Sequence, residues 1–226
     1  MHNPKPHWFI RTYARAYFWL AERLYHELAW IYDPVSWLVS LGQWDTWRKW
    51  TLEEVAGTRV LEIGFGTGEL LLEMSRRGLQ VVGMDPSAAM QRQTAAKLRR
   101  RGLHAPRLRG VSQHMPFANH SFDTILSTFP AGYINDPETW GEAARLLRLP
   151  DPAAGVSGGR FVVVGICAAA TGKRGLPATW ALFGQSMDEV LAHFMGLARH
   201  AGLEPRIVRR QNAGVEMPIL IAETTS

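Results

Sequence analysis

A glycine-rich stretch from Arg59 to Glu69, R-V-L-E-I-G-F-G-T-G-E, constrains the fold more than any other part of the chain. It begins with a short apolar run typical of a buried parallel strand, which three alternate glycines then interrupt, Gly64, Gly66 and Gly68. Leucines and a methionine follow at spacings that a helix can bury, so the loop is predicted to open onto a helix N-terminus. Free N–H groups and the helix dipole there attract polar or anionic ligand groups. The stretch therefore predicts a nucleotide-type binding turn.

The loop lacks the signatures of two common nucleotide sites. No Gly-Lys-Ser/Thr follows it, as a P-loop would require, and Glu69 stands where G-x-G-x-x-G would need its last glycine. What remains is E-x-G-x-G-x-G, which begins with the carboxylate of Glu62. This pattern resembles motif I of the class I S-adenosylmethionine (SAM) methyltransferases, in which the glycines let the backbone approach the methionine part and the ribose of SAM. The resemblance implies SAM as cofactor; the alternative is a turn that binds nothing.

A second strand is predicted at residues 80–84, with Asp85 at its carboxyl end. An acidic residue at this place can accept hydrogen bonds from ribose hydroxyls, as in other doubly wound nucleotide-binding folds. Asp85-Pro86-Ser87 can instead be only the cap of the next helix, predicted at residues 88–101, for which Ser87 is well suited. The two roles can coexist.

Strands and helical stretches alternate through the rest of the chain, which is typical of a parallel sheet covered by helices on both faces. A further helix is expected at residues 188–202. The later strands are expected at residues 108–111, 124–127, 160–166, 205–210 and 217–222, the last two as a closing hairpin. Together with the resemblance, this predicts an α/β fold with a doubly wound, mainly parallel seven-stranded sheet of the Rossmann-like methyltransferase type and an N-terminal helical extension.

Residues 110–117 resemble the G-D-A-x-x-L-P-F segment of the small-molecule branch of this family. Val111 replaces the usual aspartate, so the family's carboxylate near the adenine is missing. If the resemblance holds, Ser112, Gln113 and backbone groups have to serve instead.

Two later motifs extend the resemblance to residues 60–166. Ser121-Phe122-Asp123 matches the S-F-D entry into the fourth strand, and residues 127–130 then occupy the reaction side without the Asn/Asp-Pro-Pro-Tyr/Phe signature of base methylation. Residues 142–147 resemble E-x-x-R-x-L, and the turn that follows is expanded into a predicted exposed insertion at residues 149–159.

The resemblance assigns the candidate site residues. Those expected to contact SAM follow the first four strands: Glu62, Gly64, Phe65, Gly66, Thr67, Gly68, Asp85, Pro86, Ser87, Met90, Ser112, Gln113, His114 and Ser127. Aromatic residues are the candidates for binding the methyl acceptor: Tyr17, Tyr25, Tyr32, Phe129 and Tyr133. The candidate catalytic residues are His114 and Tyr133, but no acid–base dyad can be recognised, and an in-line methyl displacement needs few catalytic side chains.

Cys167 is the only cysteine, which excludes an internal disulfide framework and a cysteine-based zinc site and suits a reducing cytosol. It follows the fifth strand, where some cytosine methyltransferases place a cysteine, but the Pro-Cys motif that those enzymes carry after strand four is absent. We therefore expect a small buried hydrophobic side chain, and we predict no metal site.

The first fifty residues contain seven of the nine tryptophans. From Trp8 to Tyr32 there is no Gly or Pro, and apolar residues recur at three- and four-residue spacings, which predicts an amphipathic helix. Trp8, Trp19 and Trp30 are eleven residues apart and form a stripe beside basic residues. A second short helix is expected at residues 35–50.

The large aromatic side chains of this segment are expected to pack against another surface. It could cover the catalytic domain as a lid, contact a bilayer interface, where tryptophan beside arginine is favoured, or meet a second subunit. We accordingly divide the chain into residues 1–52, a helical lid or membrane-contact segment, and residues 53–226, the SAM-binding domain.

The formal charge of +5 favours anionic surfaces, and basic residues also gather from Lys97 to Arg109, as a solvated helix end or a headgroup-binding patch. The leading hypothesis is SAM-dependent methyl transfer to a small, hydrophobic or lipid-like acceptor, phospholipid N-methylation included. The alternatives are an RNA methyltransferase, which the missing base-methylation signatures oppose, and a non-catalytic SAM-binding, membrane-associated protein. No signal peptide is recognised, so we expect a cytoplasmic protein, with peripheral contact at the inner face of the membrane as a further hypothesis.

Overall fold

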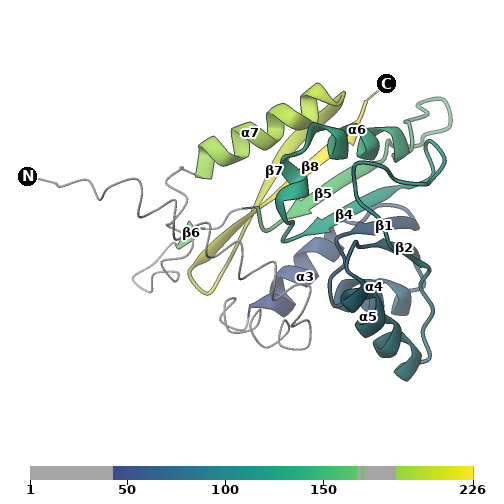
Figure 1. The fold of residues 1–226 in the computed structure, drawn as a ribbon. Coiled ribbons are helices and arrows are strands. Elements are labelled where there is room, and N and C mark those ends of the chain that lie inside the picture. Colours follow the sequence, from purple (N-terminus) through teal and green to yellow (C-terminus); the bar gives the residue numbers. More distant parts are fainter. Residues whose placement is uncertain (1–42, 167–168, 171–186, 226) are drawn as a thin grey trace, which may run out of the picture.

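The computed structural model describes residues 43–166, 169–170 and 187–225 (Figure 1). Its centre is one eight-stranded sheet in the order β3-β2-β1-β4-β5-β8-β6, with β7 paired to β8. The strands are β1 (Arg59–Ile63), β2 (Gln80–Met84), β3 (Arg107–Leu108), β4 (Thr124–Thr128), β5 (Arg160–Val164), β6 (Ala169–Ala170), β7 (Leu203–Asn212) and β8 (Val215–Thr224). Strands β1 to β5 run parallel, whereas β6, β7 and β5 each pair antiparallel with β8. The predicted seven-stranded, mainly parallel sheet is confirmed, and β6 adds a two-residue strand.

Helices cover both faces of the sheet, which confirms the doubly wound fold (Figure 1). One face carries α3 (Trp44–Glu53), α4 (Glu69–Arg76) and α5 (Ala88–Arg100), and the other carries α6 (Pro137–Leu146) and α7 (Met187–His200). A short 3₁₀ helix, η1 (Gly132–Asn135), precedes α6.

The central strands are buried on both faces, which is why they are almost continuously apolar. In β5, the side chains from Phe161 to Val164 are all 0% exposed. Alternate residues join two separate cores: Phe161 packs beside Trp140 of α6, with ring centroids 5.0 Å apart, and Val162 belongs to the core beneath α3 and α4. Both layers of helices are therefore held by the same five-residue strand.

Several elements begin or end away from their predicted bounds. β5 ends at Val164 rather than residue 166, because Gly165 has a φ of 81° and leaves the extended conformation. β3 is only Arg107–Leu108 rather than residues 108–111. The closing hairpin is confirmed but longer than predicted, and it turns at Ala213 and Gly214, which both have positive φ.

The described chain begins at residue 43. α3 begins at Trp44 and ends at Glu53, later than the helix predicted at residues 35–50. Trp47 of α3 is 2% exposed and belongs to the core beneath α4, so this tryptophan packs against the sheet. The boundary proposed between residues 52 and 53 falls at the end of this helix.

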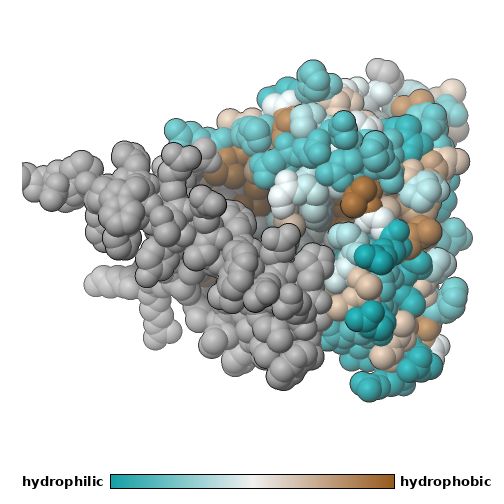
Figure 2. Space-filling view, viewed as in Figure 1, coloured by the Kyte–Doolittle hydropathy of each residue, from teal (hydrophilic) through white to brown (hydrophobic). Residues whose placement is uncertain are grey.

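The predicted insertion at residues 149–159 is exposed for most of its length, which confirms that expectation. An antiparallel bridge closes its tip, where the Asp151 N–H donates to the Val156 carbonyl at 2.9 Å and the Val156 N–H to the Asp151 carbonyl at 2.8 Å. The view in Figure 2 shows a mainly hydrophilic described surface with small, separate hydrophobic areas.

Some predictions concern residues outside the described part of the chain. These are the tryptophan stripe, the acceptor candidates Tyr17, Tyr25 and Tyr32, and the cysteine Cys167. Within the described ranges, no helix combines the length and apolar character needed to cross a membrane.

Candidate functional site

The carboxyl ends of the parallel strands meet at one edge of the sheet. β1 to β3 extend from the centre in one direction and β4 and β5 in the other, so the strand order reverses between β1 and β4. Ligands of open α/β sheets bind in the crevice at such a reversal. The glycine loop at residues 64–68, which follows β1, lies at this point.

The three glycines of the loop all have positive φ, between 53° and 74°. Gly66 is buried, but a Cβ there would meet no described atom within 4 Å, so the described residues leave room beside it. A Cβ at Gly64 would instead lie 2.5 Å from the hydroxyl oxygen of Tyr133. The loop therefore has room on one side and an aromatic side chain on the other.

Asp85 joins the glycine loop to the end of β2. Its side chain is 0% exposed, and its Oδ2 accepts from the Gly66 N–H at 2.9 Å while Oδ1 accepts from the Ser87 N–H at 2.8 Å. Ser87 caps α5, as predicted, by accepting from the Met90 N–H. Asp85 thus orients the loop and the start of α5 together; contact with a ribose stays a prediction.

Glu62 is a buried carboxyl group behind the loop. It is 1% exposed, and its Oε2 has no hydrogen-bond partner among the described residues. Burial and, next, the negative charge of Asp85 raise the pKa of Glu62 well above its usual value, against a smaller lowering by a hydrogen bond with the Leu71 backbone. The two carboxyl groups therefore differ in their surroundings. Asp85 accepts hydrogen bonds from two backbone N–H groups, whereas the environment of Glu62 favours its protonated form.

Replacing Glu62 with glutamine tests this arrangement, because the amide resembles the neutral acid. A group with a raised folded-state pKa stabilises most below its unfolded pKa and loses that contribution as pH rises through the folded pKa. Each pH unit between the two values costs the wild type about 1.4 kcal/mol. We therefore expect Glu62→Gln to match the wild type in thermal stability at pH 4 and to exceed it at pH 8, as measured by calorimetric unfolding. A stability difference independent of pH would contradict the raised pKa.

Ser127 and Tyr133 lie at the reaction side. Ser127 is a buried residue of β4, and its Oγ is 2.8 Å from the Tyr133 hydroxyl, which donates to the Ile63 carbonyl at 3.2 Å. η1 carries Tyr133, and α6 holds it in place, because Trp140 Nε1 donates to the Ile134 carbonyl at 2.8 Å. The hydroxyl is thereby fixed above the ends of β1 and β4.

Phe129, the other acceptor candidate in the described chain, lies just beyond β4. Its φ is 50°, and its N–H donates to the Val164 carbonyl at 2.7 Å. Its ring is 5.3 Å from that of Trp47 and covers Gly165, where a Cβ would overlap it. The Phe129 ring therefore packs against the core residue Trp47 and the turn after β5.

The candidates after β3 are engaged with α6. The Ser112 Oγ is 2.8 Å from the Thr139 Oγ1, and the Gln113 Nε2 donates to Asp136 Oδ2 at 3.0 Å. His114 is exposed. The first two side chains thus hold the loop to the helix.

The other cofactor candidates are distributed between core and surface. Phe65 and Met90 are 4% and 0% exposed and form a small cluster of their own, whereas Pro86 is exposed. Two contributors were missed: Thr94 Oγ1 donates to the Gly66 carbonyl at 3.2 Å, and Gln91 Nε2 bridges the Asp85 and Leu108 carbonyls. Their positions on the buried side of an amphipathic helix were the only signal in the sequence.

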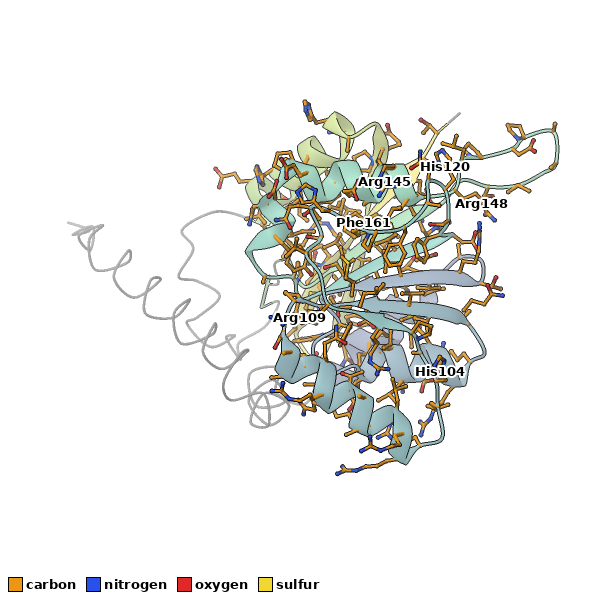
Figure 3. All side chains as sticks on the ribbon, turned by 45° about the vertical axis from the view of Figure 1, so that its right-hand side comes forward. His104, Arg109, His120, Arg145, Arg148 and Phe161 are labelled. Atoms are coloured by element: carbon orange, nitrogen blue, oxygen red, sulfur yellow. The ribbon has the colours of Figure 1, made fainter. Side chains whose placement is uncertain are left out.

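The basic residues from Lys97 to Arg109 do not form one surface. Lys97 pairs with Glu69 at 2.6 Å, and Arg109 donates to the Pro86 carbonyl at the N-terminal end of α5 (Figure 3). The exposed residues Arg99 to Arg101 lie at the other end of this helix, about 20 Å away for its length. Lys97 therefore lies beside the residue that follows the glycine loop, and Arg109 lies beside the residues that follow β2. Among the described residues no group of three or more His, Cys, Asp and Glu could hold a metal ion.

The sequence comparisons identify a known domain. The family model described as "Methyltransferase domain" matches residues 60–149. The chain is 31% identical over 143 residues to a demethylmenaquinone methyltransferase of Renibacterium salmoninarum, an alignment that covers 62% of this chain and 56% of that protein. The chain spans about half the length of the curated relatives it matches.

Solved structures show the same fold at low sequence identity. Geranyl diphosphate C-methyltransferase from Streptomyces coelicolor has a TM-score of 0.57 at 15% identity, over 80% of this chain and 79% of that one. The [4+2]-cyclase SpnF has a TM-score of 0.56 at 16% identity, over 80% and 78%. The cyclase's name indicates that this fold carries more than one activity, so the fold alone does not define the reaction. Residues 60–149 therefore match a methyltransferase domain, and the described chain shares its fold with solved methyltransferase structures.

Proposed function

We propose that the chain transfers a methyl group from SAM to a small hydrophobic acceptor. The observation that carries this proposal is the glycine loop, in which the described residues leave room beside Gly66 while Asp85 fixes its N–H. The donor set suits SAM: Asp85 for the ribose and the loop backbone for the methionine part. When bound, SAM supplies a methyl group on a sulfonium that leaves as a neutral thioether, so orientation and exclusion of water are the main tasks of the protein.

The reaction side supports an acceptor with an apolar ring or chain. The half-buried Phe129 lies just beyond β4, and the Tyr133 hydroxyl is held between Ser127 and Ile63. The relatives named above are called after demethylmenaquinone and geranyl diphosphate, both of which carry long hydrophobic chains. An isoprenoid quinol is accordingly our first choice of acceptor, and phospholipid N-methylation is the second.

The test is formation of S-adenosylhomocysteine (SAH) by the purified chain with one acceptor at a time. The acceptors are a demethylated naphthoquinol, phosphatidylethanolamine vesicles and total RNA, with an acceptor-free control. We expect turnover with the quinol above the control, and binding of SAH by calorimetry without any acceptor. Turnover only with RNA would overturn the acceptor class, and absence of SAH binding would overturn the proposed function as a whole.

Tyr133→Phe is expected to separate chemistry from cofactor binding. The ring stays over Gly64, but the hydroxyl that joins Ser127 to the Ile63 carbonyl is removed. Losing one such oriented group costs on the order of 1–1.5 kcal/mol, so kcat should fall about tenfold while the Kd for SAH changes less than about threefold. Steady-state kinetics and calorimetry measure the two effects. Ser127→Ala removes the same contact from the other partner and should reproduce part of the loss; a matching loss of SAH affinity would place the hydroxyl on the cofactor side.

A peripheral membrane contact of the N-terminal segment is a separate hypothesis, which rests on sequence alone. Trp8, Trp19 and Trp30 supply the apolar part and the neighbouring arginines the charge. The wild type should sediment with anionic vesicles at low salt and release partly at high salt, whereas the variant with all three tryptophans changed to alanine should release fully. A wild type that stays in the supernatant at low salt would show that the tryptophans contact protein instead.

A further inference from the structure

The end of β3 lies directly beside the end of β2. The Asp85 N–H donates to the Leu108 carbonyl at 3.2 Å, and Arg109 Nε donates to the Pro86 carbonyl at 2.9 Å. If SAM places its methionine part at the β1 loop and its ribose at Asp85, its base would extend past β2 and toward β3. The turn that follows β3 would then be the part of the described chain nearest to the base.

This turn presents an apolar residue to solvent. Val111 is 48% exposed, and its carbonyl already accepts from the His114 N–H at 3.3 Å. Its isopropyl group cannot accept a hydrogen bond from the exocyclic amino group of adenine. This side chain can make only an apolar contact with the base.

The two polar side chains that directly follow Val111 already have other partners. Ser112 and Gln113 bind Thr139 and Asp136, and the Asp136 carboxylate also caps α6 by accepting from the Glu138 N–H at 3.0 Å. These contacts direct the polar atoms of the turn toward α6 rather than toward the end of β2.

We propose that this chain holds the cofactor's base by shape and apolar contact, without reading its exocyclic amino group. The inference rests on the proposed function and adds a specificity to it: purine cofactors that lack or modify this amino group are accepted. A site that makes a hydrogen bond to a ligand group rejects the analogue without it strongly, whereas an apolar surface discriminates weakly. Val111 is the residue that determines this specificity.

The experiment compares the affinities of SAH and of its desamino analogue, in which hydrogen replaces the amino group and every ring nitrogen is kept. Isothermal calorimetry on the full chain gives both Kd values. We expect the wild type to bind the two ligands within about threefold of each other, and Val111→Asp to prefer SAH by about tenfold or more, because its carboxylate can accept from the amino group. Leu149→Asp, which changes another exposed apolar residue in the distant insertion, is the matched control and should behave as the wild type.

The outcomes separate the inference from the proposed function. A wild type that prefers SAH by tenfold overturns the inference and leaves SAM binding intact. A Val111→Asp variant with no preference also overturns it, because the base would then lie away from this turn. A wild type that binds neither ligand overturns the proposed function itself.

Discussion

Asp85→Asn is expected to weaken SAH binding by about 1.5–3 kcal/mol and to lower the thermal stability of the chain. Both carboxylate oxygens of Asp85 accept from backbone N–H groups, those of Gly66 and Ser87. In asparagine one oxygen becomes an NH₂ group, so a donor faces a donor inside the protein, where no water can relieve the conflict. The glycine loop then loses its attachment to β2, and a ribose would lose a charged acceptor.

Calorimetric titration with SAH and a thermal unfolding curve measure the two consequences. Asp151→Asn is the matched control, because Asp151 also accepts a backbone N–H, that of Ala154 at 3.1 Å, but in the exposed insertion. The control should retain both properties. If the Asp85→Asn variant bound SAH with wild-type affinity, Asp85 would not be part of the binding site.

Asp123→Asn is expected to cost about 2–4 kcal/mol in the free energy of unfolding at pH 7. Asp123 is 3% exposed at the amino ends of the strands, and its oxygens accept from the Thr58 and Arg59 N–H groups and from the Arg59 side chain, with Arg148 at 3.1 Å. Burial alone would raise the pKa of Asp123, but these hydrogen bonds lower it to about 2. We take a moderate cost, because the Arg59 side chain is 39% exposed and water screens the pair.

The dependence on pH provides a second readout for this substitution. A depressed folded-state pKa gives stability that is present above the unfolded pKa and is lost as pH falls through the folded pKa. The gap between wild type and Asp123→Asn, measured by urea unfolding, should therefore be full at pH 7 and smaller at pH 3. Glu73→Ala, which removes partly exposed ion pairs with Arg76 and Arg77, is the control and should cost less than about 1 kcal/mol. An equal gap at both pH values would show that packing, rather than charge, accounts for the cost.

The strand, glycine loop and helix around Gly66 could be predicted from the sequence because their signal is local. Asp85 could be placed for the same reason, since it follows a recognisable strand at a familiar distance. The contact of Tyr133 with Gly64 could not, because it joins residues 69 positions apart and depends on how η1 rests on the buried Trp140.

The direction of the side chains was the second property that could not be predicted from the sequence. Ser112 and Gln113 were predicted to face the cofactor from their place in a motif, yet they bind α6. Lys97 and Arg109 looked like members of one basic cluster, yet one pairs with Glu69 and the other binds a carbonyl at the opposite end of α5. Neighbours in sequence share a surface only if the fold leaves their side chains without partners.

The loop between β3 and β4 follows the half of the domain that holds β1 to β3, but its residues 112–122 bond mainly to α6 and the residues just after it. Besides Ser112 and Gln113, the Met115 N–H donates to Glu142. Arg145, which is labelled in Figure 3, donates to the Met115 and Phe117 carbonyls and to Asn119. α6 therefore positions both the turn after β3 and the 3₁₀ helix that carries Tyr133. A substitution that displaces α6 should consequently disturb both of these parts of the site together.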